Sequence, residues 1–193
     1  MRPAWPNEPE TAALPIIAPL GQADPAAVEA LLDQAFGTDR HGRTAYRIRE
    51  GMAWLPDLSL ANFEDDRLIA TLQCWPVALT TPEGRALPLT LVGPVAVAPG
   101  RQRDGIGRRL MEAMLAANGA AHDFVLIGDP EYYTRFFGFD DRATAGWDVP
   151  GPVERHRLLA RLRCDGWPER GMLGPVPHAR TGRATLVARA TPV

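Results

Sequence analysis

Lysine is absent from this 193-residue sequence, and all 21 of its basic residues are arginine. This absence excludes Schiff-base chemistry and phosphate binding through the lysine of a Walker A loop. Cysteine is scarce, because Cys74 and Cys164 are the only two, and they lack the spacing of metal ligands. We therefore expect reduced thiols and no metal site.

Long apolar runs and an excess of one charge are also missing. No segment approaches the roughly 18 apolar residues of a membrane span, and the N-terminus carries no secretory signal. The formal net charge of −2 gives no reason to expect nucleic-acid binding. These absences predict a cytoplasmic protein that binds neither membranes nor nucleic acids.

A hydrophobic content of 46% over 193 residues is enough for one well-filled domain. Pro150-Gly151-Pro152 is a clear break, and residues 166–193 are rich in glycine, proline and arginine, with a candidate strand over 184–188. We expect a single domain over residues 1–165 and a C-terminal extension over 166–193 that packs on it.

The first part of the chain predicts an edge strand and two helices. The apolar run Leu14–Leu20 is typical of an edge strand, because Pro15 cannot donate to a ladder. Asp24-Pro25 combines an N-cap with a proline at the first helical position, and apolar residues recur at helical spacing until Gly37. A second, more polar helix is expected over residues 44–50.

From Leu58 onward the apolar pattern becomes that of strands. Segments 58–63, 68–79 and 87–97 are separated by turn signals at 64–66 and 81–84, which predicts three consecutive antiparallel strands. After them we expect a helix over 106–118, a buried strand over 124–128, a helix over 131–137 and a strand over 155–163.

The segment Leu91–Arg109, LVGPVAVAPGRQRDGIGRR, joins the third of these strands to a helix. Its loop ends at a helix N-terminus, where unpaired N–H groups and the positive end of the helix dipole attract anions. Gly105 and Gly107 leave room for a ligand close to the backbone, and the arginines at 101, 103, 108 and 109 suit phosphate oxygens. We infer an anion site for a phosphorylated cofactor.

Two other phosphate-binding loops fit this segment less well. A Walker A loop needs Lys-Ser/Thr after its second glycine, where this chain has Ile106-Gly107, so we reject it. A dinucleotide-binding fingerprint needs a third glycine where this chain has Leu110. The upstream strands also form hairpins rather than βαβ units, so we disfavour that reading.

Residues 102–107, QRDGIG, match the (Q/R)xxGx(G/A) pattern of acetyl-CoA pyrophosphate loops. With VAVAP before this loop, and a tyrosine-bearing helix that ends in GF after it, the chain resembles the GNAT family of N-acetyltransferases. Its sequence is most similar to the family's bacterial branch of small predicted acetyltransferases, and the resemblance covers residues 14–148. The resemblance implies an α/β (α+β) GNAT fold with a central mixed, mostly antiparallel twisted sheet of six to seven strands, flanked by about four helices.

The resemblance also implies how acetyl-CoA would bind. The backbone of Val95, Ala96 and Val97 would pair with the pantetheine arm where this strand splays from its neighbour at a bulge, and one N–H would polarise the thioester carbonyl. The pyrophosphate would be held by Gln102, Arg103, Asp104, Gly105, Ile106, Gly107 and Arg108. Because the charge of Asp104 opposes such a ligand, we expect Asp104 to be the N-cap of the following helix rather than to pair with Arg101 or Arg108.

In this family a tyrosine on the short helix before Gly138-Phe139 protonates the leaving thiolate, a role that suits a phenol with a pKa of about 10. Tyr132 and Tyr133 both qualify, and we prefer Tyr133. The doubled Phe136-Phe137 places Tyr133 one residue further from Gly138 than the family's Tyr-x-x-x-Gly-Phe spacing. Packing of both tyrosines as aromatic filler against these phenylalanines is the alternative.

The implied activity is transfer of an acetyl group from acetyl-CoA to a primary amine of a small molecule or a protein. A non-catalytic acyl-CoA-binding module is the alternative, and a homodimer is left open. Glu50, Asp57 and the four histidines qualify as a general base by type alone. The acceptor carries no readable motif. For the tryptophans at 54, 75, 147 and 167 we expect buried core rather than an acceptor pocket.

Overall fold

The structure of the chain, a computed structural model, describes residues 15–177. The helices are α1 (Pro25–Phe36), α2 (Thr44–Ile48), α3 (Ile106–Asn118) and α4 (Pro130–Phe137), with short 3₁₀ turns η1 (Leu20–Gln22), η2 (Thr38–Gly42) and η3 (Arg155–Arg157). The strands are β1 (Ile16–Pro19), β2 (Leu60–Glu64), β3 (Arg67–Thr80), β4 (Ala86–Val97), β5 (Phe124–Ile127), β6 (Trp147–Asp148), β7 (Leu158–Arg161) and β8 (Gly171–Pro175).

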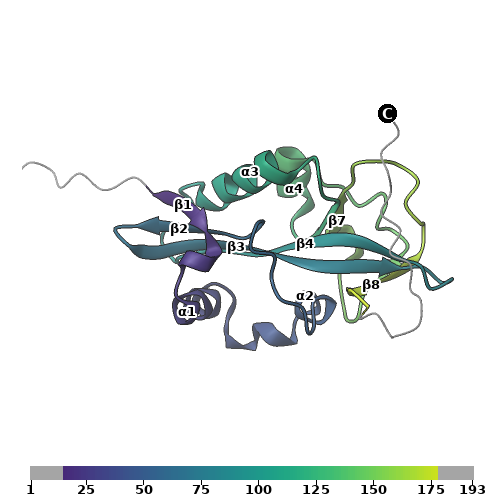
Figure 1. The fold of residues 1–193 in the computed structure, drawn as a ribbon, viewed down its shortest axis with the longest axis horizontal. Helices are drawn as coiled ribbons and strands as arrows, with labels where there is room; N and C mark the ends of the chain where they lie inside the picture. The colour runs from purple at the N-terminus through teal and green to yellow at the C-terminus, as the bar shows by residue number, and fades with distance from the viewer. Residues whose placement is uncertain (1–14, 178–193) are drawn as a thin grey trace, which may run out of the picture.

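The eight strands of this part of the chain form one sheet in the order β1-β2-β3-β4-β5-β7, with β8 on the last residues of β3 and β6 beside β8. Neighbours are antiparallel except for β4–β5 and β6–β8. Figure 1 shows α3 and α4 on one face of the sheet and α1 and α2 on the other. The predicted mixed, mostly antiparallel sheet with four α-helices is confirmed.

The sheet has eight strands rather than six to seven because β6 and β8 join it. β8 comes from the region expected as a C-terminal extension, and it pairs with residues 77–80 of β3. Its sequence, GMLGP, has two glycines and a proline and therefore no strand pattern of its own. The strand expected over 184–188 lies outside the described residues.

Local signals set the helix ends. The Asp24 carboxylate accepts a hydrogen bond from the N–H of Ala26 (3.3 Å), and α1 begins at Pro25. At α4 the same arrangement recurs, since Asp129 accepts from the N–H of Glu131 (3.0 Å) ahead of Pro130. Both caps satisfy N–H groups that a helix leaves unpaired, so the boundaries follow directly from the sequence.

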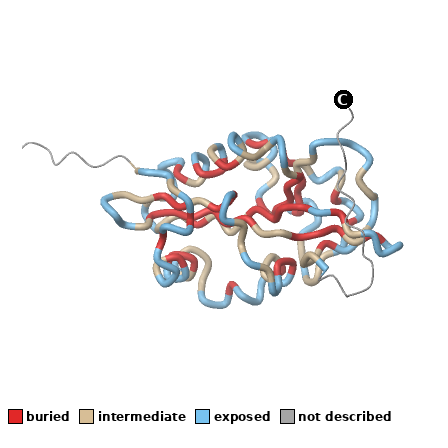
Figure 2. Tube along the Cα trace, viewed as in Figure 1, coloured by how far each residue is buried: buried red, intermediate tan, exposed pale blue. Residues whose placement is uncertain are grey.

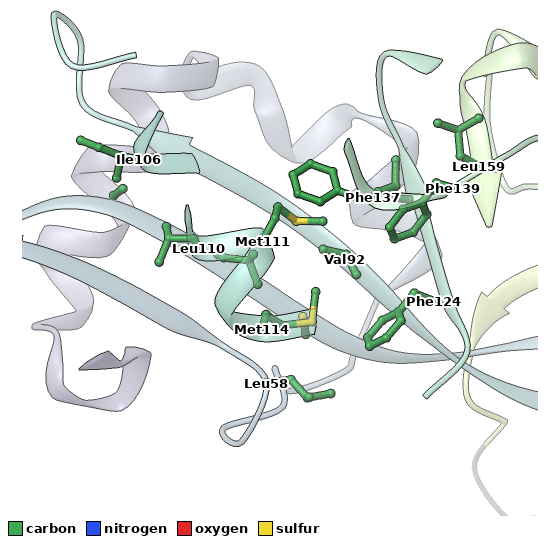
Figure 3. Packing of buried hydrophobic residues seen from close by; sticks show 14 of the residues in the cluster. Leu58, Val92, Ile106, Leu110, Met111, Met114, Phe124, Phe137, Phe139 and Leu159 are labelled. Atoms are coloured by element: carbon green, nitrogen blue, oxygen red, sulfur yellow. The ribbon is translucent and has the colours of Figure 1, made fainter. Parts of the chain in front are cut away.

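Many residues of the central strands are buried (Figure 2), and they belong to clusters that pack against helices on both sides of the sheet. On one face α3 contributes Ile106, Leu110, Met111 and Met114, which pack with residues of β4, β5 and the end of α4 (Figure 3). On the other face α1 packs on the sheet through Val28, Leu31 and Leu32. Full burial of each such side chain contributes about 1.5–3 kcal/mol, which anchors both helices on the strands. None of the described helices has the length and apolar character needed to cross a bilayer.

Candidate active site

A bulge interrupts β4 in the middle of the sheet. Gly93 and Pro94 of β4 together oppose the single β3 residue Gln73, and the register shifts at this point. Gly93 has a φ of +124°, in the region that favours glycine. The bulge therefore depends on a residue without a Cβ and divides β4 into two differently oriented parts.

The bulge changes which backbone groups of β4 face away from β3. The N–H of Thr90 donates to Asp123 O, on the β5 side (2.9 Å), whereas the N–H of Ala98 donates to Ile69 O, on the β3 side (2.8 Å). In an uninterrupted strand, two residues separated by an even number of positions would point the same way. The inserted residue reverses this alternation after Gly93 and Pro94.

The reversal directs the backbone of Val95 and Val97 away from β3, while Ala96 faces its β3 partner Thr71. On the outer side β4 pairs with β5 at Thr90 and Leu91. From Val92 onward this edge has no partner strand in the described part of the chain. Of the three backbone positions predicted to hold the cofactor, two therefore present free hydrogen-bonding groups to the gap between β4 and β5, and Ala96 does not.

The predicted phosphate loop leads into the first turn of α3. Gly105 is the N-cap, with a φ of +70°, and the N–H of Arg109 is the first to bond back, to Gly105 O (3.0 Å). The preceding N–H groups, those of Ile106, Gly107 and Arg108, have no intrahelical acceptor and point out of the helix end. This is the geometry of an anion site, and it needs the positive φ of Gly105.

Gly107 joins the loop to the open edge of β4. A Cβ built at Gly107 would lie 3.5 Å from Cγ1 of Val95 and 3.5 Å from Cγ2 of Val97. The helix N-terminus therefore sits directly over the two residues whose backbone faces the gap. A linear ligand with an anionic group at one end and amide groups along its length fits this path.

Asp104 does not cap α3 with its side chain, contrary to our expectation. Its carboxylate instead accepts a hydrogen bond from Nε of Arg101 (2.5 Å), and Arg101 also forms an ion pair with Glu64 of β2. The N-cap position is taken by Gly105, because the turn needs a left-handed residue there. Arg101 thus neutralises the acidic residue of the loop instead of facing a ligand.

The other predicted loop residues lie around the helix start. Gln102, Arg103 and Arg108 are exposed, and the Ile106 side chain is buried in the core. Arg108 is bound to Glu112 by Nε (2.7 Å), and its guanidinium carbon lies 4.5 Å from the ring centroid of Phe136. The loop can therefore offer backbone N–H groups together with the charge of Arg103 and of Arg108, whose pair with Glu112 is solvent-exposed and therefore weak.

A cavity of about 510 Å³ opens at the bulge. Its lining includes residues 91–95 of β4, Ile127 of β5, Tyr133 of α4, Tyr46 and Arg49 at α2, and residues 152–154 with Arg157 around η3. The phenol predicted as a proton donor therefore faces the same space as the open edge of β4. Tyr132 is absent from this lining.

Tyr133 is held by close packing against the end of β5. A Cβ at Gly128 would lie 2.3 Å from Cε2 of Tyr133, so the ring occupies the space that any other residue at 128 would need. Burial, with smaller contributions from Tyr132 and Asp129, raises the pKa of Tyr133 to about 12. The phenol is therefore protonated at neutral pH, as a proton donor must be.

Tyr132 faces the neighbouring helix and the core. Its ring packs edge-on against Tyr133 and Phe137, with centroids 5.1 Å and 5.6 Å away. Burial raises its pKa, an effect partly offset by the charge of Arg108. Tyr132 therefore matches the alternative in which the tyrosines only pack against the phenylalanines. Tyr133 packs against Phe137 and also lines the cavity.

Arg49 lines the cavity and has no counterpart in the sequence predictions. Its side chain is buried between the rings of Tyr46 and Trp75, at 4.0 Å and 4.1 Å from the two centroids. Nη1 donates to Gly93 O at the bulge (2.9 Å), and burial lowers the pKa of Arg49 to about 10. Nothing local marks this arginine among the 21 basic residues, because Tyr46 is its one nearby partner while Trp75 and Gly93 come from β3 and β4.

A second cavity, of about 490 Å³, lies beyond Arg49. Tyr46 and Arg49 line both cavities, and the second also includes Glu50, Trp54 and Trp75. Of the four tryptophans expected in the core, Trp147 is fully buried and packs near Trp167 (5.9 Å between centroids), but Trp54 and Trp75 face this cavity. Among the general-base candidates Glu50 and His41 line it, whereas Asp57 lines neither cavity.

The chain is similar to known acetyltransferases in sequence pattern and in fold. A family model described as an acetyltransferase (GNAT) domain matches residues 17–139. The fold is similar to that of the GNAT family N-acetyltransferase YhbS from Escherichia coli in complex with CoA, with 23% identity, 96% of this chain and 100% of that chain covered, and a TM-score of 0.64. It is also similar to a GNAT family acetyltransferase from Brucella melitensis in complex with acetyl-CoA, with 24% identity, 86% and 97% coverage, and a TM-score of 0.57.

No curated protein sequence matches the chain significantly. At the identities of the two structures the likeness is one of fold, and the family model carries the assignment by sequence. It spans the loop at the start of α3, the bulged strand β4 and the tyrosines of α4. Because this match covers more than half of the sequence, the chain belongs to the GNAT family of acetyltransferases.

Proposed function

We propose that this protein transfers the acetyl group of acetyl-CoA to the nitrogen of a primary amine. One arrangement carries the proposal: the open edge of β4 extends from the start of α3, where Gly107 packs on Val95 and Val97, to the cavity at the bulge that the phenol of Tyr133 lines. The complexes of two similar structures with CoA and acetyl-CoA support the same ligand here.

The residues of the path fit the parts of acetyl-CoA. The N–H groups of residues 106–108, with Arg103 and Arg108, would hold the pyrophosphate. The backbone of Val95 and Val97 would pair with the pantetheine amides as an added strand does. Ala96 faces β3 instead, so its backbone contributes to the sheet. Because Gly107 has no side chain, the start of α3 packs closely on the side chains of Val95 and Val97.

When bound, acetyl-CoA supplies a thioester carbonyl and a thiolate leaving group. An outward-facing β4 N–H at the bulge can donate a hydrogen bond to the carbonyl oxygen as negative charge develops there. The amine nitrogen bonds to the carbonyl carbon, the carbon–sulfur bond breaks, and the sulfur takes the phenolic proton of Tyr133. The amine nitrogen loses a proton to solvent, and the phenolate of Tyr133 takes up a proton from solvent, so that the exchange balances.

The test begins with calorimetric titration of acetyl-CoA, followed by thiol release from acetyl-CoA with a panel of primary amines. We expect micromolar binding, and the Tyr133→Phe variant should bind equally well but turn over about 100-fold more slowly, the usual contribution of a general acid. Tyr132→Phe is the matched control and should retain turnover. Absence of acetyl-CoA binding would overturn the proposal, and binding without turnover on any amine would favour a non-catalytic acyl-CoA-binding module.

A further inference from the structure

The cavity at the bulge has cations on its walls that are not matched by acids. Arg43, Arg49 and Arg157 line it, and each donates to a main-chain carbonyl: Arg43 to Phe36 O (2.6 Å), Arg49 to Gly93 O (2.9 Å) and Arg157 to Gly128 O (3.3 Å). Within the described residues none of the three forms an ion pair with a carboxylate.

Arg40 differs from these three arginines because it is paired with carboxylates and has a structural role. It lines the same cavity, but its guanidinium is bound by Glu29 and Asp33 of α1 and donates to Oη of Tyr46. Its charge is therefore cancelled within the protein. Glu154 is the one acid in the cavity lining among the described residues, and it lies 3.5 Å from Nε2 of His156.

The environment of Arg49 is the strongest evidence that the cavity binds an anion. The exposed fraction of Arg49 is 5%, so the guanidinium has left water without gaining an anionic partner. Burying a charge is costly unless it is paired, and a guanidinium has five N–H donors in a planar fork that matches a carboxylate or phosphate. The rings of Tyr46 and Trp75 cover its faces and Nη1 donates to Gly93 O, so the other N–H groups along the edge of the fork remain for a ligand.

We propose that the acceptor is a small primary amine that also carries an anionic group, a carboxylate or a phosphate, and that Arg49 binds this group while Arg43 and Arg157 attract it at the rim. This inference rests on the proposed function and names its substrate class. The anion is not a phosphate of the cofactor, because none of the loop residues 100–108 lines this cavity.

The same charges would help the reaction. Nearby guanidinium groups disfavour the protonated form of an amine, and only the neutral amine can attack a thioester. An acceptor with an anionic group enters this field favourably, whereas a purely cationic amine is repelled. The cavity thus selects the acceptor and promotes its deprotonation without a dedicated base.

The experiment measures binding to the CoA-saturated protein by calorimetry, with two matched pairs of probes. L-Phenylalanine is compared with phenethylamine, which lacks the carboxylate, and O-phosphoethanolamine with ethanolamine, which lacks the phosphate. Within at least one pair we expect the anionic member to bind at least about tenfold more tightly, as charge-assisted hydrogen bonds to a buried arginine predict. The pair that shows the larger ratio identifies the anion.

Arg49→Gln should bring this ratio close to one. Arg47→Gln is the matched control, because Arg47 lies two residues earlier in α2, is exposed, donates to Pro150 O (3.4 Å) and does not line the cavity. If Arg49→Gln does not fold, the double variant Arg43→Gln/Arg157→Gln, which changes two exposed residues, should lower the ratio at least about threefold. The inference is overturned if the unchanged protein binds the anionic and neutral members of both pairs equally well. It is also overturned if the preference for the anionic member is undiminished in Arg49→Gln or, where that variant does not fold, in the double variant.

The two proposals fail separately. Acetyl-CoA titrations on the same samples test the proposed function. If acetyl-CoA binds and the neutral amines are acetylated as well as their anionic partners, the substrate class is wrong while the acetyltransferase activity stands. If acetyl-CoA does not bind, the proposed function falls, and the ratios measured without CoA still report whether Arg49 selects an anion.

Discussion

The ring of Tyr133 rests against Gly128, where even a methyl group would come within 2.3 Å of Cε2 and 2.6 Å of Cδ2. The φ of Gly128 lies outside the left-handed region, so the position needs glycine for space and not for backbone conformation. The end of β5 thereby decides which tyrosine of α4 reaches the cavity at the bulge. It also makes the placement of Tyr133 testable without changing the tyrosine itself.

Gly128→Ala should displace the phenol. We expect turnover to fall at least about tenfold, toward the level of Tyr133→Phe, with acetyl-CoA affinity nearly unchanged and a loss of stability of about 1–3 kcal/mol from overpacking. Steady-state kinetics, calorimetry and thermal unfolding measure the three quantities. Gly174→Ala in β8 is the control, since a Cβ there meets no atom within 4 Å. Unchanged turnover in Gly128→Ala would contradict the role of Tyr133.

Neutralisation of Asp104 by Arg101 predicts a specific pattern of acetyl-CoA affinities. Arg101→Gln leaves Asp104 uncompensated beside the pyrophosphate, so we expect binding to weaken roughly five- to tenfold at low salt and less at high salt. Asp104→Asn should bind at least as well as the unchanged protein, and the double variant should recover most of the loss. Titrations at two ionic strengths test this.

A control for that pattern is Arg142→Gln, which removes the exposed pair between Arg142 and Asp140 (2.6 Å) away from the loop. This change should leave acetyl-CoA affinity as it is. If Asp104→Asn fails to rescue Arg101→Gln, then Arg101 acts on the ligand or on the loop conformation directly, and the neutralisation argument is wrong.

The raised pKa of Tyr133 predicts a turnover rate that does not decline in moderately alkaline solution. Burial, then Tyr132 and Asp129, raise this pKa to about 12, above the ordinary value of 10, so the folded protein keeps the phenolic proton where a free tyrosine loses it. We expect kcat to rise as the acceptor amine is deprotonated and then to stay level to about pH 10.5. A decline centred near pH 9 would contradict a buried tyrosine as the proton donor.

The same shift has a consequence for stability. Between about pH 10 and 12 the unfolded chain loses the Tyr133 proton while the folded protein retains it, so stability falls as pH rises. The comparison with Tyr133→Phe isolates this contribution from other groups, including Arg49, whose lowered pKa acts in the opposite direction. Chemical denaturation of both proteins should show the unchanged protein losing stability relative to the variant over this range.

The two cysteines should differ sharply in reactivity. Cys74 is buried in β3, and burial raises the pKa of its thiol, whereas Cys164 is exposed. Because the thiolate is the reactive form, a chromogenic disulfide reagent should label one of the two thiols in the folded protein and both after denaturation. Cys164→Ser should abolish the native labelling, and rapid modification of Cys74 would contradict its burial.

Much of the fold follows from interactions between residues close in the chain. Capping by Asp24 and Asp129 with a proline one position later sets the start of α1 and α4. The turn between β2 and β3 uses Asp65 and Asp66, both with positive φ (47° and 59°), as residues of a tight hairpin. Such signals act within a few residues, so they are readable without knowledge of the fold.

Residues with distant partners could not be assigned in this way. Asp104 is of a residue type that often caps helices, but its carboxylate is bound by Arg101 instead. Arg101 also forms an ion pair with Glu64. Trp54 and Trp75 have the hydrophobicity of core residues, yet they line a cavity because the sheet and α2 leave a space between them. In each case a segment far away in the sequence takes part, β2 through Glu64 at the loop and α1 with η1 at the cavity beside the tryptophans.

The sequence by itself determined the positions of the helices and main strands, the glycine-rich loop at the start of α3 and the two tyrosines of α4, because caps, periodicity and turns depend on neighbours in the chain. Tertiary structure alone decided that Val95 and Val97 face the gap while Ala96 does not, that Tyr133 rather than Tyr132 reaches the cavity, and that Arg49 is buried beside Gly93. These outcomes depend on the register of β3 with β4 and on the space left by Gly128, which arise only when the sheet assembles.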